Sequence, residues 1–467
     1  MIPVVTPDEM RAIDASASAP VARLIERAGA AVARSAIDLL GGTYGRTVTV
    51  LAGSGNNGAD GREAATRLRQ RGVRVRVLDA ASLPDELPQS DLFIDAAYGT
   101  GFRPDPSRPW APPRTDGAPV LAVDIPSGVD GLTGVAVPGA LPADRTVTFQ
   151  ALKPGLLFGD GPALAGDVEV VDIGLDTSHI RCHLVERVDA CEWWPVRADR
   201  AHKWHAALKV VAGSNAMPGA AELCTAAALR AGSGLVSLSA PGCRPSTRSE
   251  VVQHPIASSG YSADVLGDIA RFGALVIGPG LGRDDGTLQA ARCCLTDAPV
   301  PVVVDGDAIF AVAQVGDGAG GWLTGRSHPT ILTPHDGEFA VLTGDPPGDD
   351  RLAAVRAAAT RFGSVILVKG PTTVIAAPAD APDEQGSVLI VDHGDRRLAT
   401  AGSGDVLAGM IGAVLAAGVE PMRAAAAAAW VHAECARSGV GAGLVAGDLI
   451  DLLPAAIAGL RHQGVRE

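Results

Sequence analysis

The chain has 467 residues, more than one ordinary hydrophobic core accommodates, so two or three domains are expected. Its composition, 47% apolar and 19% charged, is typical of a globular protein. Its 39 Lys and Arg against 52 Asp and Glu give a net charge of −13, which argues against a nucleic-acid partner because phosphate binding draws on basic side chains.

Strand and helix alternate in the first part of the chain. Residues 6–40 are expected to be helical, because Thr6 and Glu9 form a capping box and Gly41-Gly42 end the helix. A charged helix is predicted from about Asp60. Short apolar or β-branched runs predict strands at 47–51, 73–78, 92–95, 120–124, 146–149 and 168–173. This alternation predicts a parallel α/β sheet with ligands bound beyond the carboxyl ends of its strands.

The alternation stops between residues 176 and 200, a charged stretch that contains Trp193-Trp194-Pro195. A domain boundary is therefore expected after Pro195, giving domains 1–195 and 196–467. The second domain is expected to contain helices at 219–231, at 405–417 and from 422 onward, and strands at 208–212, 274–277, 302–305, 330–333, 365–369 and 373–376. This pattern predicts a second layered α/β domain.

Cysteine usage and the N-terminus favour a cytoplasmic protein. The seven cysteines are irregularly spaced and include no C-x-x-C pair, so reduced, mostly buried thiols are expected and a zinc knuckle is not. The N-terminal residues lack the basic and then apolar pattern of a signal peptide. No apolar run reaches about 18 residues, so no membrane partner is expected.

A glycine-rich loop follows the strand at 47–51. Gly53, Gly55 and Gly58 fit G-x-G-x-x-G, and Asp79 follows about 20 residues later, which is the fingerprint of a dinucleotide-binding dehydrogenase. Asp60 weakens this interpretation, because it places an anion at the helix start where a pyrophosphate needs backbone N–H groups.

Carboxylates also end two further strands, at Asp95 and Asp124. A lone strand-end aspartate is usually a loop cap, but several beside Asn57 favour a site. Oxygen ligands from Asn57, Asp95 and Ser127 would suit a hard cation, and a strand-end carboxylate can move protons in an epimerisation.

The strings GNNGADG (55–61), DAAYGTG (95–101), VDIPSGVDG (123–131) and TFQALKPG (148–155) resemble the YjeF N-terminal domain, the epimerase of NAD(P)HX, the hydrated form of NADH and NADPH. The resemblance covers about residues 1–175 and implies a Rossmann-like parallel sheet. It departs from the family at Ala59, where glycine is usual. It implies potassium ligands at Asn57, Asp95 and Ser127, and catalysis by Asp124, as acid/base group, with Lys153 nearby. The implied substrate contacts are Asn56, Asn57, Gly58, Ala59, Asp60, Gly99, Thr100, Gly101, Phe102, Arg103, Pro104, Asp105 and Asp124.

The strongest signal in the second domain is the segment Ala401-Gly402-Ser403-Gly404-Asp405, followed by an apolar helix. Small residues at a helix N-terminus expose backbone N–H groups to a phosphate, and Asp405 at the edge is placed as a general base. The alternative is a plain glycine-rich turn with an aspartate cap. No Walker-type sequence G-x-x-x-x-G-K-[ST] occurs.

Together with GPGLG (278–282), LTPH (332–335) and VKGPTT (368–373), this segment resembles the ribokinase-like NAD(P)HX dehydratase domain over about residues 200–460. Trp204 and Asp336 depart from that family, where glycine and proline are usual. The resemblance implies that Mg²⁺ and a nucleotide, ADP rather than ATP, are used. The implied nucleotide contacts are Lys369, Gly370, Pro371, Thr372, Thr373 and Gly404, and the implied contacts to the hydrate are Ala220, Gly280, His335 and Asp405.

The two resemblances imply one repair enzyme for nicotinamide nucleotides. It would epimerise R- and S-NAD(P)HX and dehydrate the S form to NAD(P)H, using ADP and giving AMP and phosphate; a homo-oligomer is expected. The alternatives are a ribokinase-class small-molecule kinase, which shares the G-S-G-D logic, an NAD-dependent dehydrogenase, and a non-enzymatic nucleotide-sensing scaffold.

Overall fold

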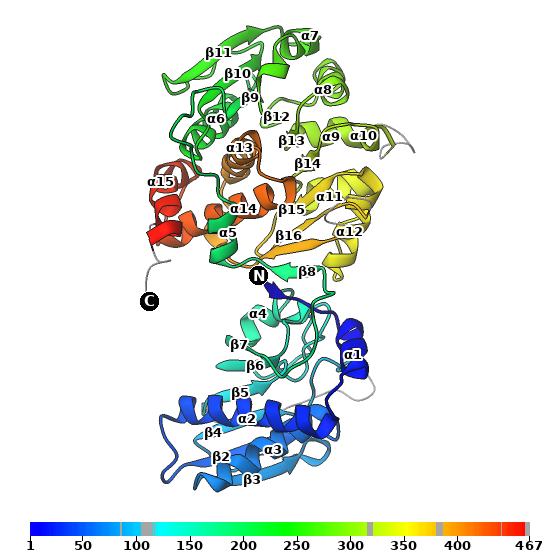
Figure 1. The fold of residues 1–467 in the computed structure, drawn as a ribbon, viewed down its shortest axis with the longest axis vertical. Coiled ribbons are helices and arrows are strands. Elements are labelled where there is room, and N and C mark those ends of the chain that lie inside the picture. Colours follow the sequence, from blue (N-terminus) through cyan, green and yellow to red (C-terminus); the bar gives the residue numbers. More distant parts are fainter. Residues whose placement is uncertain are drawn as a thin grey trace. The chain divides into compact units, whose positions relative to one another are not determined.

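The computed structural model describes residues 1–84, 86–103, 115, 117–314, 321–379, 386–439 and 441–462. The chain forms two compact units, one of Ile2–Cys182 and one of Met1 with His183–Glu467 (Figure 1). Each unit contains its own sheet, parallel in the first unit and mostly parallel in the second, so the predicted combination of two α/β domains is confirmed.

The N-terminal unit is a six-stranded sheet in the order β3-β2-β4-β5-β6-β7, parallel throughout. Helices α1, α2 and α3 pack their apolar sides onto one face of the sheet, and a smaller apolar cluster covers the other. Its elements are β1 (Ile2–Pro3), α1 (Pro7–Ser16), α2 (Val21–Leu40), β2 (Thr47–Ala52), α3 (Asn56–Gln70), β3 (Arg74–Asp79), β4 (Leu92–Ala96), β5 (Val120–Val123), β6 (Arg145–Phe149), α4 (Gly161–Leu164) and β7 (Asp167–Val171), with 3₁₀ turns at Ala80–Ser82 and Pro154–Leu156.

Two helices of this unit differ from the prediction. The helix expected over residues 6–40 is broken between α1 and α2, because Pro20 disfavours the helical conformation in the residue before it. The capping box of Thr6 and Glu9 and the left-handed Gly41 at the end of α2 are confirmed. Helix α3 begins at Asn56 rather than near Asp60, so the glycine-rich segment forms the first helical turn.

The C-terminal unit contains the sheet order β8-β17-β16-β15-β14-β13-β12-β9-β10-β11, in which β15–β16 and β16–β17 are antiparallel. Helices α6, α13, α14 and α15 pack together in its main core (Figure 1). Its strands are β8 (Cys182–Leu184), β9 (Ala207–Val211), β10 (Leu235–Pro241), β11 (Val251–Ile256), β12 (Ala274–Ile277), β13 (Val302–Val304), β14 (Thr330–Leu332), β15 (Val365–Val368), β16 (Thr373–Ala376) and β17 (Val388–Val391).

The helices of the C-terminal unit alternate with these strands along most of its length. They are α5 (Arg187–Trp193), α6 (Pro218–Arg230), α7 (Ser262–Leu266), α8 (Asp285–Asp297), α9 (Asp307–Ala313), α10 (Gly321–Thr324), α11 (Asp336–Thr343), α12 (Arg351–Phe362), α13 (Ser403–Ala416), α14 (Pro421–Ser438) and α15 (Ala446–His462), with 3₁₀ turns at Ile269–Arg271 and Arg396–Leu398. Among the described residues, no helix combines the length and apolarity that crossing a bilayer requires.

The division between the units falls after Cys182, whereas the sequence led us to expect it after Pro195. The physical reason is the tryptophan pair. Trp193 and Trp194 are buried in the main apolar cluster of the C-terminal unit, and α5 packs against α14. The charged stretch that interrupts the sequence pattern therefore contributes its tryptophan pair to the core of the C-terminal unit.

Candidate functional site

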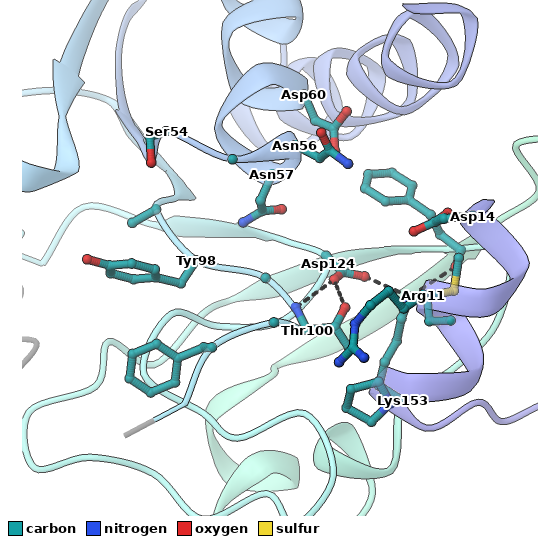
Figure 2. Close-up of a pocket in the computed structure, with 18 of the residues that line it drawn as sticks. Arg11, Asp14, Ser54, Asn56, Asn57, Asp60, Tyr98, Thr100, Asp124 and Lys153 are labelled. Carbon is teal, nitrogen blue, oxygen red and sulfur yellow. Dashed lines mark hydrogen bonds and ion pairs between the residues drawn. The ribbon is translucent and has the colours of Figure 1, made fainter. Parts of the chain in front are cut away.

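The N-terminal unit has a cavity of about 460 Å³ at the carboxyl ends of β2 and β4 (Figure 2). The chain passes from β2 to β3 on one side and then returns to β4 on the other, so this edge is the switch point at which ligands bind in such sheets. The cavity is lined by Pro7, Met10, Arg11, Asp14, Ser54, Gly55, Asn56, Asn57, Asp60, Ala97, Tyr98, Gly99, Thr100, Gly101, Phe102, Asp124, Phe149, Lys153 and Ile173.

The first turn of α3 forms one wall of this cavity. A side chain at Gly58 would place its Cβ 1.9 Å from the Gly53 carbonyl oxygen, so only glycine lets the helix start this close to the end of β2. Both polar atoms of the Asn57 amide are buried without a hydrogen-bond partner. A Cβ at Gly99 would lie 3.2 Å from Asn57 Cγ and 3.0 Å from Asp124 Oδ2, so glycine keeps the space between these side chains open.

Asp124 is held in place by a dense set of partners. It has φ of 69°, a left-handed conformation that is rare outside glycine and common at functional sites. Its Oδ2 accepts hydrogen bonds from the Thr100 backbone N–H (3.0 Å) and hydroxyl, and its Oδ1 lies 2.7 Å from Lys153 Nζ and 3.3 Å from Thr148 Oγ1. Burial alone would raise the pKa of Asp124, but the charge and hydrogen bond of Lys153 outweigh it and lower that pKa. Asp124 is therefore an ionised carboxylate near neutral pH.

Asp60 lies in a different environment on the same cavity. The residue is 8% exposed, and burial, followed by repulsion from Asp124 and Asp14, raises its pKa to about 8. Burial also raises the pKa of Asp14, which extends from α1 into the cavity (Figure 2). The cavity thus combines one carboxylate held ionised with a carboxyl group that is largely protonated at pH 7.

The expected potassium ligands are only partly brought together. Asp95 accepts hydrogen bonds from Ser127, at 2.8 Å from its backbone N and 2.6 Å from its Oγ, and burial raises the pKa of Asp95. Neither residue contacts Asn57 through a hydrogen bond. The orphaned Asn57 amide and the buried Asp95 carboxyl suit a weakly hydrated cation, which would satisfy the amide oxygen and balance the charge.

The remaining epimerase-side predictions divide into three groups. Phe102 and Tyr98 pack with ring centroids 5.3 Å apart at the cavity, whereas exposed Arg103 lies 3.6 Å from Asp130. Pro104 and Asp105 lie outside the described residues. Asp79 does not line the cavity; its side chain caps Ala81, so the acidic partner that a dehydrogenase needs is absent from the described part of this site.

The sequence reasoning missed the contribution of α1. Asp14 follows Met10 by four residues and Arg11 by three, so it shares a helix face with each of them, and all three line the cavity. That spacing is visible in the sequence, but the surface that the face meets is set by tertiary packing.

The C-terminal unit repeats the switch-point arrangement between β9 and β12, because β10 and β11 lie on one side of β9 and β12 on the other. The loops after β9 and β12 contact each other through the Gly213 N–H and the Pro279 carbonyl at 2.8 Å. A Cβ at Gly280, which has φ of 62°, would lie 2.7 Å from the Ala220 Cβ. Two predicted substrate contacts, Ala220 and Gly280, therefore lie together at this point.

Lys369, which follows β15, lies close to the carboxyl groups of Asp305, which follows β13, and Glu338 of α11. Its Nζ is 2.8 Å from Asp305 Oδ1 and 3.7 Å from Glu338 Oε2, and Thr333 donates to the same Asp305 oxygen at 2.7 Å. Burial lowers the pKa of Lys369, but Asp305 and Glu338 outweigh it and raise that pKa. A Cβ at Gly404 would lie 3.3 Å from the Lys369 ammonium, so these two predicted nucleotide contacts are adjacent.

Asp405 lies in the first turn of α13, whose N-cap Gly402 has φ of 88°. The first backbone N–H groups of a helix have no partner within it, so they are open to an anion. Burial, followed by repulsion from Asp305, raises the pKa of Asp405 to about 7. A carboxyl group with this pKa can accept a proton near neutral pH more readily than an ordinary aspartate.

His335 is the N-cap of α11, where its Nδ1 accepts hydrogen bonds from the backbone N–H groups of Gly337 and Glu338 while the ring stays exposed. Asp336, which departs from the family pattern, pairs with Arg351 at 2.5 Å, and Arg351 donates to the Lys369 carbonyl at 3.1 Å. Through Arg351, Asp336 therefore connects α11 to the predicted nucleotide-binding loop after β15.

Of the other predicted nucleotide contacts, Gly370, Pro371 and Thr372 lie in the turn that joins β15 to the antiparallel β16, and Thr373 begins β16. A Cβ at Gly394 would lie 2.0 Å from the Pro371 carbonyl oxygen, so a second loop packs directly against this turn.

The described residues contain no cluster of three or more His, Cys, Asp or Glu side chains that could hold a metal ion. Asp307, two residues after Asp305, accepts hydrogen bonds from Gly282 N and Arg283 Nε. A divalent cation at this site would therefore rely on phosphate oxygens for much of its coordination.

Comparison with known proteins finds a family match for each of the two units. Residues 208–454 match the family described as NAD(P)H-hydrate dehydratase, and residues 21–88 and 78–155 match the YjeF-related protein N-terminus. The bifunctional NAD(P)H-hydrate repair enzyme Nnr of Mycobacterium tuberculosis is 40% identical over 454 residues, covering 90% of each chain. The enzyme of the same name from Escherichia coli is 33% identical, covering 83% of this chain and 79% of its own.

Among solved structures, a ribokinase-like superfamily protein from Enterococcus faecalis is 21% identical with a TM-score of 0.51, covering 60% of this chain and 96% of its own, which supports the ribokinase-like fold of the C-terminal unit. The 40% sequence identity to the Mycobacterium tuberculosis enzyme covers most of both chains, and the two family matches cover the first and second halves of this chain. The chain belongs to the family of bifunctional NAD(P)H-hydrate repair enzymes.

Proposed function

We propose that this protein repairs hydrated NADH and NADPH, epimerising the R and S hydrates in the N-terminal unit and dehydrating the S hydrate in the C-terminal unit with ADP, which yields AMP and phosphate. The observation that carries the proposal is the placement of Asp405. It lies at the open N-terminus of α13 beside Lys369, with its pKa raised to about 7.

In the dehydratase half, Asp405 removes the proton from the ring hydroxyl, and the oxygen attacks the terminal phosphoryl group of the nucleotide. The phosphorus–oxygen bond to AMP breaks, and the ring now carries phosphate as its leaving group. Loss of phosphate and of a ring proton restores the dihydronicotinamide. Lys369 and the N–H groups of α13 stabilise the phosphoryl charge, and Mg²⁺ bound with the nucleotide would add to this.

In the epimerase half, the ionised Asp124, fixed by Lys153 and Thr100, contacts the hydroxyl-bearing ring. The substrate fills the cavity between α3 and the loop that follows β4, bounded by Asn57 and Gly99. Potassium held by Asn57, Asp95 and Ser127 would neutralise buried negative charge beside this cavity.

The test mixes the purified protein with R and S hydrates of NADH, ADP, Mg²⁺ and K⁺, and follows the return of NADH absorbance. Full recovery is expected for the wild type, biphasic recovery for Asp124→Asn, and none for Asp405→Asn. Parallel reactions with ATP decide the nucleotide. No recovery with either nucleotide refutes the dehydratase, and a phosphorylated product that persists would instead support the kinase alternative.

We also propose a cytoplasmic homo-oligomer. Light scattering on the purified protein tests its assembly, and a particle with the mass of one chain contradicts it. Fractionation of cells tests its location.

A further inference from the structure

The cavity of the N-terminal unit contains two carboxyl groups in opposite electrostatic states. Asp124 has both oxygens engaged, with Thr100 at Oδ2 and Lys153 and Thr148 near Oδ1. No hydrogen bond or ion pair among the described residues engages the Asp60 carboxyl group, although Asp60 is only 8% exposed and lines the cavity. Figure 2 shows Asp60 on α3, above Asp124 in this view.

Epimerisation at a hydroxyl-bearing carbon next to the ring nitrogen needs a proton donor. The nitrogen lone pair can expel the hydroxyl group only if the departing oxygen receives a proton, because hydroxide is a poor leaving group. A carboxylate clamped by an ammonium group carries no proton to give near neutral pH. Asp124 therefore cannot supply the acid half of the reaction.

We infer that Asp60 is the general acid of the epimerase, and that Asp124 is the fixed anion that stabilises the cationic ring formed when the hydroxyl leaves. This inference rests on the proposed epimerase function. Two carboxyl groups whose surroundings drive their pKa values apart mark the acid and the ionised partner in other enzymes that break a carbon–oxygen bond beside a lone pair.

Asp60 gives its proton to the ring hydroxyl, the carbon–oxygen bond breaks, and water leaves while the nitrogen lone pair forms a carbon–nitrogen double bond. Water then adds to the other face of the carbon, and the double-bond electron pair returns to nitrogen. The added water loses one proton to bulk solvent, and Asp60 regains one from bulk solvent.

Several charged groups around Asp60 set its proton affinity. Burial dominates, and the repulsion from Asp124 and Asp14 adds to it. Other charged side chains lie on neighbouring elements or on the same helix. They are Arg11 on α1, Arg27 on α2, which donates to the Ile173 carbonyl at the cavity, Lys153, and Arg62 and Glu63 on α3.

The test measures kcat and KM for epimerisation from pH 6 to 9.5 after subtraction of the uncatalysed rate. For the wild type, kcat is expected to fall about tenfold per pH unit above pH 8 to 9, because the acid loses its proton. Asp60→Asn should lower kcat by about 100-fold or more with little change in KM, and should remove this limb. Asp14→Asn should move the limb to lower pH, since one repulsive charge is removed.

Two controls separate folding from chemistry. Asp79→Asn changes an exposed aspartate of the same unit and should leave the epimerase profile unchanged. Dehydration of pure S hydrate by the C-terminal unit should be unchanged in Asp60→Asn. If the wild type epimerises and Asp60→Asn keeps its kcat and alkaline limb, the inference is wrong while the proposed function stands. If the wild type does not epimerise, the proposed function itself fails.

Discussion

The pH dependence of the dehydratase follows from the surroundings of Asp405. Its pKa of about 7 means that the carboxyl group is about 90% ionised at pH 8 and about 10% ionised at pH 6. If Asp405 is the base that accepts the hydroxyl proton, kcat should fall about tenfold as the pH decreases from 8 to 6. An aspartate with an ordinary pKa would give a flat profile over the same range.

A second perturbation moves that profile in a defined direction. Asp305→Asn removes the neighbour that raises the pKa of Asp405 most after burial, and it also frees the Lys369 charge from its 2.8 Å ion pair. Both changes favour the ionised form of Asp405, so the rising limb of kcat should shift to lower pH. The asparagine can still accept the hydrogen bond from Thr333, which limits the structural damage.

The assay uses pure S hydrate and saturating magnesium nucleotide, with NADH absorbance recorded from pH 5.5 to 8.5. The KM for the nucleotide is measured at each pH, because phosphate groups titrate near pH 6 and would otherwise mimic the effect. A kcat that is constant between pH 6 and 8, or a limb that stays in place in Asp305→Asn, would refute the assignment of Asp405 as the base.

Three further outcomes are expected. Lys153→Met should lower the free energy of unfolding of the N-terminal unit by about 3–5 kcal/mol in denaturant titration, because the Lys153 charge would no longer offset the burial of the Asp124 carboxyl group; an unchanged midpoint would contradict this. Gly280 has φ of 62°, and the new methyl group of Gly280→Ala would lie 2.7 Å from the Ala220 Cβ, so this variant should have a lower dehydratase kcat/KM. The matched control Gly260→Ala has a similar φ but open space around the new methyl group. It should lose only about 1–2 kcal/mol of stability. If Asn57 is a potassium ligand, replacing sodium by potassium should raise the epimerase rate and the melting temperature of the wild type. Asn57→Leu should abolish both increases, since the unpartnered amide is lost. A potassium response that persists in this variant would exclude Asn57 as a ligand.

Much of the fold could be predicted because parallel strands leave short, strongly apolar runs. The edge strand β11, with Gln253, His254 and Pro255, lacks such a run and was not predicted. The early start of α3 was also missed, because asparagine and glycine have low helix propensity and the turn is fixed by the contact between Gly58 and Gly53.

The candidate sites could be predicted only as far as chain position determines them. Asp95 and Asp124 end neighbouring strands, so their convergence follows from a parallel sheet. The different proton affinities of Asp60 and Asp124 do not follow from the sequence. They depend on burial and on Lys153, which approaches from a later segment of the chain.

The division into two units has an evolutionary consequence. Each site is built from one unit, the first from residues 7–173 and the second from residues 220–405. Under the proposed activities, a null mutation in the first half leaves repair of the S hydrate intact, and the R hydrate then depends on spontaneous epimerisation. A null mutation in the second half leaves an epimerase that interconverts damaged molecules and repairs none. Selection can therefore retain the second half as a separate gene, but the first half is useful only in a cell that also has a dehydratase.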